Sequence, residues 1–229
     1  AKVGYNASLI FYDSMLVDIT TEEKMDSVSS HGYAWGYIGS CIPFVISLVF
    51  VLMYDKIGIS MTTAMMLAFF LNALWWLVVT IPLLKNYHQT NYVELPDHPI
   101  KNSFKRLAVT LRDIKKHKNI FLYLLSFFFF IDGVYTIIEM ATAYGSALGL
   151  DSQGLLLALL VTQLVAFPCA LIFSVLSKKF DTDFLIKICI AAYTGIALFA
   201  IQLDKQWEFW LLAVLVGMFQ GAIQALSRS

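Results

Sequence analysis

Long apolar blocks, each close to the length of a membrane-spanning helix, constrain this chain more than any other feature. A transmembrane helix needs about 20 apolar residues, because each residue adds about 1.5 Å and the hydrocarbon core is about 30 Å thick. We predict seven spans, at 3–19, 33–54, 60–84, 120–145, 152–176, 184–202 and 207–226. The chain is 59% hydrophobic and only 14% charged, far more apolar than a soluble domain. The sequence therefore predicts an all-α integral membrane protein.

Basic residues fall in alternate connections between these spans. One set of connections holds Lys24, the segment 85–119, Lys178, Lys179 and Arg228, and the opposite set holds only Lys56 and Lys205. Connections rich in Lys and Arg stay in the cytoplasm. We therefore expect the first span to run inward and 85–119 to be cytoplasmic.

The long connection 85–119 separates two predicted helical domains, 1–84 with three spans and 120–229 with four. From Ser103, a residue type suited to a helix N-cap, apolar and basic residues alternate at helical spacing. The apolar ones are Phe104, Leu107, Ala108, Leu111 and Ile114, and the basic ones are Lys105, Arg106, Arg112, Lys115 and Lys116. This pattern predicts an amphipathic helix on the membrane face. Anionic lipid accounts for its charge, so we expect no nucleic-acid partner.

The fourth span carries two acids well inside its ends. Asp132 and Glu139 are seven residues apart, close to two helical turns, so both project from one face. A charge at mid-bilayer costs ~2.5 kcal/mol or more, and such residues face a protein interior or a watery cavity. They are our first candidates for solute binding or proton coupling. The alternative is a structural role in hydrogen bonds between helices.

Other polar residues inside the spans are few. They are Asn6 and Asp13 in the first span, Asn72 in the third, Gln163 in the fifth, and Gln220 and Gln224 in the seventh. The polar load is thus greatest on the first, fourth and seventh spans, so we expect these helices to line a central path. For the amide side chains, hydrogen bonding between helices is the alternative.

No lysine or arginine lies at mid-membrane to neutralise Asp13, Asp132 or Glu139. Three options remain open from the sequence. The acids can be protonated, because burial disfavours the charged form. They can meet a cation on a helix outside this chain, or they can face water and bind a cationic ligand or ion.

We find no residue pattern typical of an enzyme or a metal site. No histidine lies within a span, and none has a cysteine partner at metal-binding spacing. The three cysteines, Cys41, Cys169 and Cys189, lie singly inside apolar blocks. We therefore expect no catalytic activity, no cofactor and no metal.

Three motifs resemble signatures of the Atg22-like branch of the major facilitator superfamily. They are DSVSSHGYAWGYIG at 26–39, DGVYTI at 132–137 and QGAIQALSRS at 220–229. They occur in the family's order, and the resemblance covers essentially the whole chain. It implies a twelve-helix transporter of which this chain resembles helices four to ten. It also implies that the first, fourth and seventh predicted spans line the transport cavity.

The segment 174–187 resembles the superfamily's cytoplasmic loop motif between helices eight and nine, with Asp181 where glycine is usual. The resemblance implies state-dependent ion pairs for Lys178, Lys179 and Asp183. Together with Asp26 and Arg228, these residues are our candidates for a gate at the cytoplasmic side.

The resemblance implies a secondary active transporter of small solutes that works by alternating access in the lipid bilayer. Amino acids, associated with the yeast member, are one candidate substrate, and the proton is a candidate coupling ion. Asp132, Glu139 and Asp13 would bind the proton or a substrate ammonium group. The competing hypothesis is a receptor or scaffold that uses the same fold without transport.

The short loops favour a bacterial cytoplasmic membrane, with a vacuolar membrane as the fungal alternative. We expect a monomer. The chain begins at Ala1 without a methionine and stops just after an apolar block, so we also expect a segment of a longer protein.

Overall fold

The structure is a computed structural model that describes residues 2–92, 97–114 and 116–228. Every regular element in these ranges is a helix, as predicted. They are α1 (Lys2–Ser14), α2 (Leu16–Ile19), η1 (Glu22–Lys24), α3 (Met25–Leu52), α4 (Tyr54–Ile57), α5 (Met61–Asn86), α6 (Pro99–Ile114), α7 (Lys118–Ala147), α8 (Ser152–Leu176), α9 (Thr182–Ile201) and α10 (Gln206–Leu226). Lys115, counted above on the basic face of the amphipathic helix, and Ser229, the last residue of the third motif, lie outside the described residues.

Six helices of the described chain are long and apolar enough to cross a membrane: η1 with α3, then α5, α7, α8, α9 and α10. They correspond to six of the seven predicted spans. The remaining predicted span, at 3–19, is not among these six, because α1 is 13 residues long in the described chain and is separated from α2 at Met15. Local hydrogen bonds accompany the break. The Ser14 hydroxyl donates to the Phe11 carbonyl at 2.7 Å, and the Met15 amide is shared between the Phe11 and Tyr12 carbonyls.

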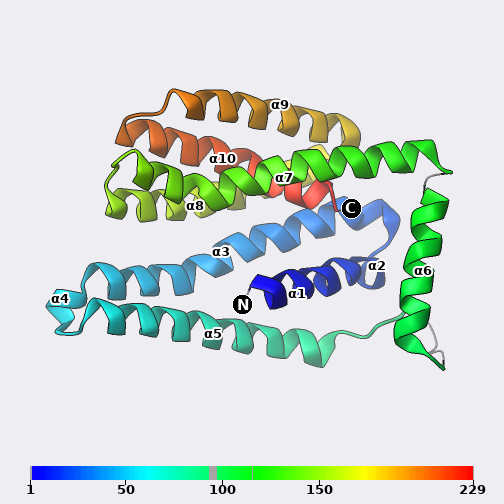
Figure 1. Ribbon diagram of the computed structural model, residues 1–229, viewed down its shortest axis with the longest axis horizontal. Helices are drawn as coiled ribbons and strands as arrows, with labels where there is room; N and C mark the ends of the chain where they lie inside the picture. Colours follow the sequence, from blue (N-terminus) through cyan, green and yellow to red (C-terminus); the bar gives the residue numbers. More distant parts are fainter. Residues whose placement is uncertain (1, 93–96, 115, 229) are drawn as a thin grey trace.

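The membrane-length helices run side by side along the long axis of the molecule (Figure 1). α3 is central in this arrangement, because it packs against α5 on one side and against α8 and α10 on the other. α6 runs across one end of the bundle, where α5 ends and α7 begins (Figure 1). We call this the α6 end; the sequence predicts that it is cytoplasmic.

Glycines bring α10 into close contact with its neighbours. A Cβ atom on Gly217 would lie 2.7 Å from the Thr162 carbonyl oxygen of α8. One on Gly221 would lie 2.9 Å from the Ala170 Cβ of α8 and 3.0 Å from the Tyr37 ring of α3. Small residues permit this approach of helix backbones in a membrane, where packing replaces the hydrophobic effect as the driving force.

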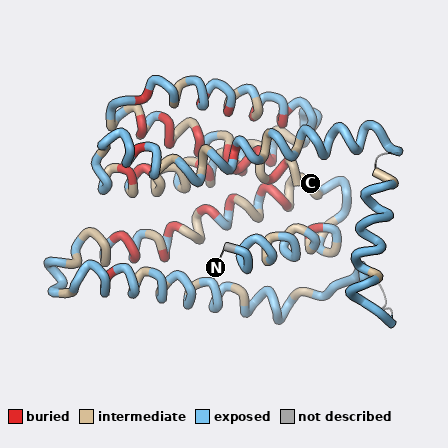
Figure 2. Tube along the Cα trace, viewed as in Figure 1, coloured by how far each residue is buried: buried red, intermediate tan, exposed pale blue. Residues whose placement is uncertain are grey.

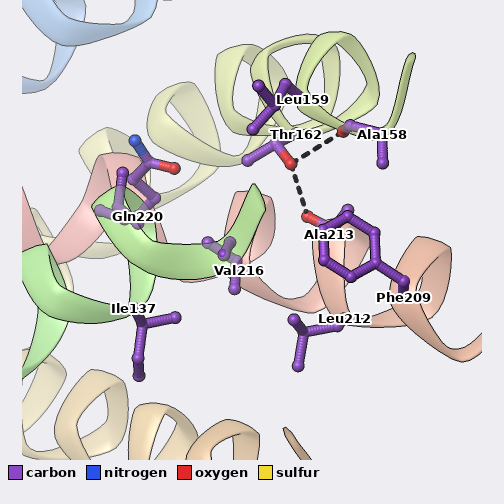
Figure 3. A pocket seen from close by; sticks show the side chains of 11 residues that line it. Ile137, Ala158, Leu159, Thr162, Phe209, Leu212, Ala213, Val216 and Gln220 are labelled. Atoms are coloured by element: carbon purple, nitrogen blue, oxygen red, sulfur yellow. Dashed lines mark hydrogen bonds between the residues drawn. The ribbon is translucent and has the colours of Figure 1, made fainter. Parts of the chain in front are cut away.

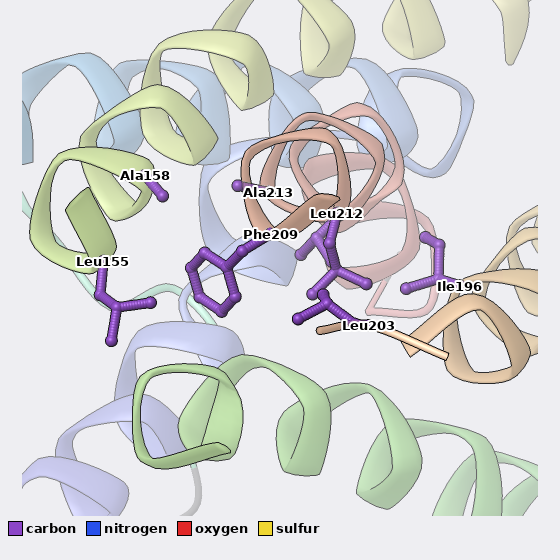
Figure 4. Packing of buried hydrophobic residues seen from close by; sticks show 8 residues of the cluster. Leu155, Ala158, Ile196, Leu203, Phe209, Leu212 and Ala213 are labelled. Atoms are coloured by element: carbon purple, nitrogen blue, oxygen red, sulfur yellow. The ribbon is translucent and has the colours of Figure 1, made fainter. Parts of the chain in front are cut away.

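The buried residues concentrate on α8, α9 and α10 and on part of α3, whereas α5, α6 and much of α7 are exposed (Figure 2). The largest buried cluster, shown in Figure 4, joins α8, α9 and α10 through Leu155, Ala158, Ile196, Leu203, Phe209, Leu212, Ala213 and Val216. The exposed faces are themselves apolar, as at Phe69, Phe129 and Leu198, which are 72%, 67% and 62% exposed. Such faces are suited to contact with lipid chains.

Candidate functional site

A large cavity of about 1120 Å³ lies among α1, α3, α7, α8 and α10. Ligand pockets in proteins are typically about 300–1,000 Å³, so the space is ample for a small solute. Its lining is formed by Tyr5, Asn6, Leu9, Tyr12, Gly32, Tyr33, Gly36, Tyr37, Ser40, Asp132, Tyr135, Thr136, Ile138, Glu139, Met140, Gln163, Gln220 and Gln224.

Six of the predicted site residues meet in this cavity. Asp132 and Glu139 reach it from α7, and Tyr135 and Thr136 lie between them on the same face of the helix. The amide side chains come from three other helices: Asn6 from α1, Gln163 from α8, and Gln220 and Gln224 from α10. Polar groups that are far apart in the sequence thus converge on one space.

Two of the residues predicted to bind solute or to line the path, Asn72 and Asp13, do not line this cavity. Asn72, on α5, donates to the Ser47 hydroxyl of α3 at 3.0 Å and to the Ala68 carbonyl at 2.8 Å. It therefore bridges α5 and α3. Asp13 lies at the α6 end and pairs with Arg228, whose Nη1 is 2.9 Å from Asp13 Oδ1.

Five tyrosines form a part of the lining that the sequence analysis did not find: Tyr5, Tyr12, Tyr33, Tyr37 and Tyr135. Two of them belong to α3, a helix not expected to line the path. The sequence does contain a pattern that could have indicated them: Tyr33 and Tyr37 are one helical turn apart, and each follows a glycine. A Cβ on Gly36 would meet nothing within 4 Å, so this glycine leaves open space beside the two rings.

Two glutamines in the cavity are in different hydrogen-bonding situations. Gln224 Oε1 accepts a 2.6 Å hydrogen bond from the Tyr37 hydroxyl, which links α10 to α3. The Oε1 atom of Gln163 is buried and has no hydrogen-bond partner among the described residues. A buried carbonyl oxygen without a donor is costly. Gln163 is therefore suited to accept a hydrogen bond from a bound molecule.

Arg228 lies beside the cavity at the α6 end, where it contacts two of the lining residues, Tyr12 and Tyr33. Its side chain is only 11% exposed and its Nε donates to the Ser29 hydroxyl at 3.1 Å. The guanidinium carbon lies 4.8 Å from the centre of the Tyr12 ring and 4.9 Å from that of Tyr33. The guanidinium of Arg228, at the end of α10, thus contacts two residues of α1, an aspartate and a tyrosine. It also contacts two residues of α3, a serine and a tyrosine.

A second set of polar contacts crosses the same end. Thr182 at the start of α9 donates to Asp26 of α3 at 2.6 Å. The hydroxyls of Ser27 and Ser174 lie 3.2 Å apart, which joins α3 to α8. We call the residues of both sets the polar closure: Tyr12, Asp13, Asp26, Ser27, Ser29, Tyr33, Ser174, Thr182 and Arg228. The other candidate gate residues, Lys178, Lys179 and Asp183, are exposed and form no salt bridge within the described part of the chain.

A third polar cluster at the α6 end ties the segment after α5 to α2. Asp18 accepts hydrogen bonds from the Tyr87 hydroxyl, from the Thr90 hydroxyl at 2.8 Å and from the Asn91 amide at 2.8 Å. The bond from Tyr87 and that from the Asn91 backbone hold the pKa of Asp18 well below its usual range. Nothing in the sequence pattern pointed to this cluster.

A small pocket of about 30 Å³ lies next to the main cavity, with which it shares Ile138 and Gln220. Figure 3 shows aliphatic side chains of α7, α8 and α10 around it, and Thr162 donating to the carbonyls of Ala158 and Ala213. An apolar space of this size does not suit a polar solute. Among the described residues, no group of three or more His, Cys, Asp or Glu side chains could hold a metal ion.

Comparison with known proteins adds three findings. Residues 9–229 match the model of the family described as "Vacuole effluxer Atg22 like". The chain is 44% identical over 231 residues to the "Uncharacterized MFS-type transporter YxiO" of Bacillus subtilis, and the match covers all of this chain and 54% of that protein. It is 26% identical over 227 residues to "Autophagy-related protein 22-1" of Penicillium rubens, which covers 88% of this chain and 38% of that protein.

The chain thus spans about half the length of the Bacillus relative and less of the fungal one. No solved structure matches it.

Proposed function

The chain belongs to the family of Atg22-like vacuole effluxers, and from this premise we propose that it forms part of a secondary active transporter of small solutes. Its relatives include proteins named as a transporter of the major facilitator type and as autophagy-related protein 22. The six membrane-length helices make it an integral membrane protein. The proposal assigns the transport step to the cavity among α1, α3, α7, α8 and α10.

One observation carries the proposal: a cavity between helices of 1–84 and helices of 120–229 gathers polar groups from both segments. At the α6 end these segments are joined by the polar closure, in which Arg228 of the second contacts Asp13, Tyr12 and Tyr33 of the first. Alternating access requires that such a closure breaks while the opposite end closes. We take 1–84 and 120–229 to be the two parts that move.

In this proposal the two acids of α7 bind the positive charge that is transported, either a proton or an ammonium group of the solute. Asp132 and Glu139 lie about two turns apart on α7, and both line the cavity. A carboxyl group that alternates between water and a closed site can carry a proton or bind a substrate ammonium group. Amino acids are therefore the first solutes to test, and the proton is the first coupling ion. The amides of Asn6, Gln163, Gln220 and Gln224 would contact the solute.

The test uses the full-length protein in proteoliposomes with an imposed pH gradient. Labelled amino acids and then other small solutes are screened with the wild type, Asp132→Asn and Glu139→Gln. We expect gradient-driven flux that falls at least about tenfold in one of the two variants, as when a catalytic proton carrier is lost. Asp55→Asn is the matched control, because Asp55 is an exposed acid of α4 outside the cavity. Its flux should stay normal.

The possible results separate the hypotheses. Flux unchanged in both cavity variants would leave a transporter whose coupling does not use these acids. No flux for any solute, with folded protein confirmed, would favour the alternative of a receptor or scaffold with this fold.

A further inference from the structure

α6 carries an exposed apolar stripe. Ile100, Phe104, Leu107 and Leu111 recur at helical spacing on one face, and their side chains are 75%, 70%, 55% and 55% exposed. The helix packs only against the start of α7 among the main element contacts of the described chain. Its apolar stripe therefore lacks a protein cover in this structure.

Basic side chains border this stripe on both sides. At 100° per residue, Lys101, Lys105 and Arg112 fall together on one flank of the stripe and Arg106 falls on the other. The helix holds a single acid, Asp113, and this acid forms a salt bridge with Lys116 at 2.8 Å. A cationic border around an apolar stripe matches the boundary between lipid headgroups and acyl chains, where long basic side chains reach outward to phosphate groups.

The position of α6 fits that boundary. α5, before it, and α7, after it, are both of membrane-crossing length, so their adjoining ends lie near one membrane surface. α6 runs across these ends rather than along the bundle (Figure 1). A helix placed in this way lies roughly parallel to the membrane surface.

We propose that α6 is a binding site for anionic phospholipids of the adjoining leaflet. Lys101, Lys105, Arg106 and Arg112 contact the headgroup phosphates, and the apolar stripe enters the acyl boundary. A protein partner or a second copy of this chain could cover the stripe, but neither would account for cations on both of its borders. The inference does not depend on which solute the protein transports, or on whether it transports one.

The test measures which lipids surround α6 in the full-length protein. A fluorophore is attached at Leu107→Cys in bilayers of phosphatidylcholine with about one third phosphatidylglycerol. Its quenching by spin-labelled phosphatidylglycerol is then compared with quenching by spin-labelled phosphatidylcholine at the same mole fraction. We expect phosphatidylglycerol to quench about threefold more strongly at low salt, and the difference to shrink at about 1 M salt, where the Debye length is about 3 Å.

One further variant tests the basic border, and two others serve as controls. The variant Lys101→Gln/Lys105→Gln/Arg112→Gln should bring the quenching ratio close to one, whereas Lys56→Gln, a basic residue of α4 at the opposite end, should leave it unchanged. A fluorophore at Val78→Cys, on an exposed face of α5, should give a ratio near one and thus report the bulk lipid.

Three results would overturn the proposal. They are a ratio near one at Leu107→Cys in the otherwise unaltered protein, a high ratio that survives in the triple variant, and no quenching by either lipid. The last result would mean that protein covers the stripe.

Discussion

At the scale of single residues, Arg228 makes several different contacts across the bundle. It combines an ion pair with Asp13, a hydrogen bond to Ser29 and two ring contacts, while its side chain is almost fully covered. A planar guanidinium can stack on rings and donate at its edge at the same time, whereas an ammonium group is a compact point charge. Arginine is therefore better suited than lysine to this position of the polar closure.

Replacing Arg228 should weaken the closure even when the positive charge is kept. We expect Arg228→Lys to lower the free energy of unfolding by about 1 kcal/mol, because the two ring contacts are reduced. Arg228→Gln should cost more, because it also leaves the half-exposed Asp13 without its cation. Thermal unfolding in detergent measures both, and Asp13→Asn added to Arg228→Gln should cost little further. Fully additive losses would show that the pair does not interact.

Asp18 makes a pH-dependent contribution whose sign follows from its partners. Its pKa is lowered in the folded protein by hydrogen bonds from Tyr87 and Asn91. Its contribution is thus complete above the ordinary aspartate pKa of about 3.9 and is lost as the pH falls further. A spin-label distance between α2 and Asn91 should stay constant from about pH 8 to pH 5. In Asp18→Asn the distance should be longer at every pH. Equal distances in the wild type and Asp18→Asn would mean that the hydrogen bonds of Asp18 do not hold α2 to the segment after α5.

At the scale of helix pairs, the contact of α8 with α10 depends on the absence of side chains. Gly217→Ala would place a methyl group 2.7 Å from the Thr162 carbonyl, closer than atoms of this kind can approach. We expect this substitution to lower the free energy of unfolding by about 1–3 kcal/mol, since backbone must move.

Gly195→Ala is the matched control in α9. A Cβ there would meet nothing within 4 Å, and alanine is the better helix former by about 1 kcal/mol. Unfolding of this variant should be unchanged or occur at a slightly higher temperature. A similar loss in both variants would contradict the packing argument.

The helices themselves were largely predictable, because bilayer thickness fixes their length. The span predicted at 152–176 coincides with α8, and four others deviate by at most two residues at each end. α3 begins eight residues before its predicted start because the polar turn at Met25 to Gly32 is also helical. The break between α1 and α2 at Met15 leaves no mark in the hydropathy pattern.

The candidate site was predicted in part. Acids and amides inside apolar blocks are conspicuous because they are costly in lipid, so Asp132, Glu139 and Gln220 were found. Tyrosine gives no such signal, because its ring suits a packed core as well as a cavity, so Tyr33 and Tyr37 were missed. The pair Asp13 and Arg228 joins residues 215 positions apart, and sequence spacing predicts no contact at that range.

At the scale of the whole molecule, the polar closure joins parts that the proposed transport cycle must separate. Ser27 of α3 and Ser174 of α8 lie close enough for their cysteine variants to be bridged by a short thiol reagent. We expect bridging of Ser27→Cys/Ser174→Cys to stop solute flux and reduction to restore it. Bridging Ser47→Cys/Asn72→Cys, within 1–84, should leave flux intact. Normal flux through the first bridged variant would mean that this end does not open.

The glycine contacts of α10 have a mechanical consequence. Gly217 and Gly221 lie against α8, and such close packing favours movement of the two helices as one unit. Gln163, Gln220, Gln224 and Arg228 are carried on this unit. In the proposed transport cycle, a displacement that a bound solute produces at Gln220 or Gln224 would therefore also move Arg228, about two turns and one turn further along the chain, so that filling of the cavity and loosening of its α6 end would be coupled.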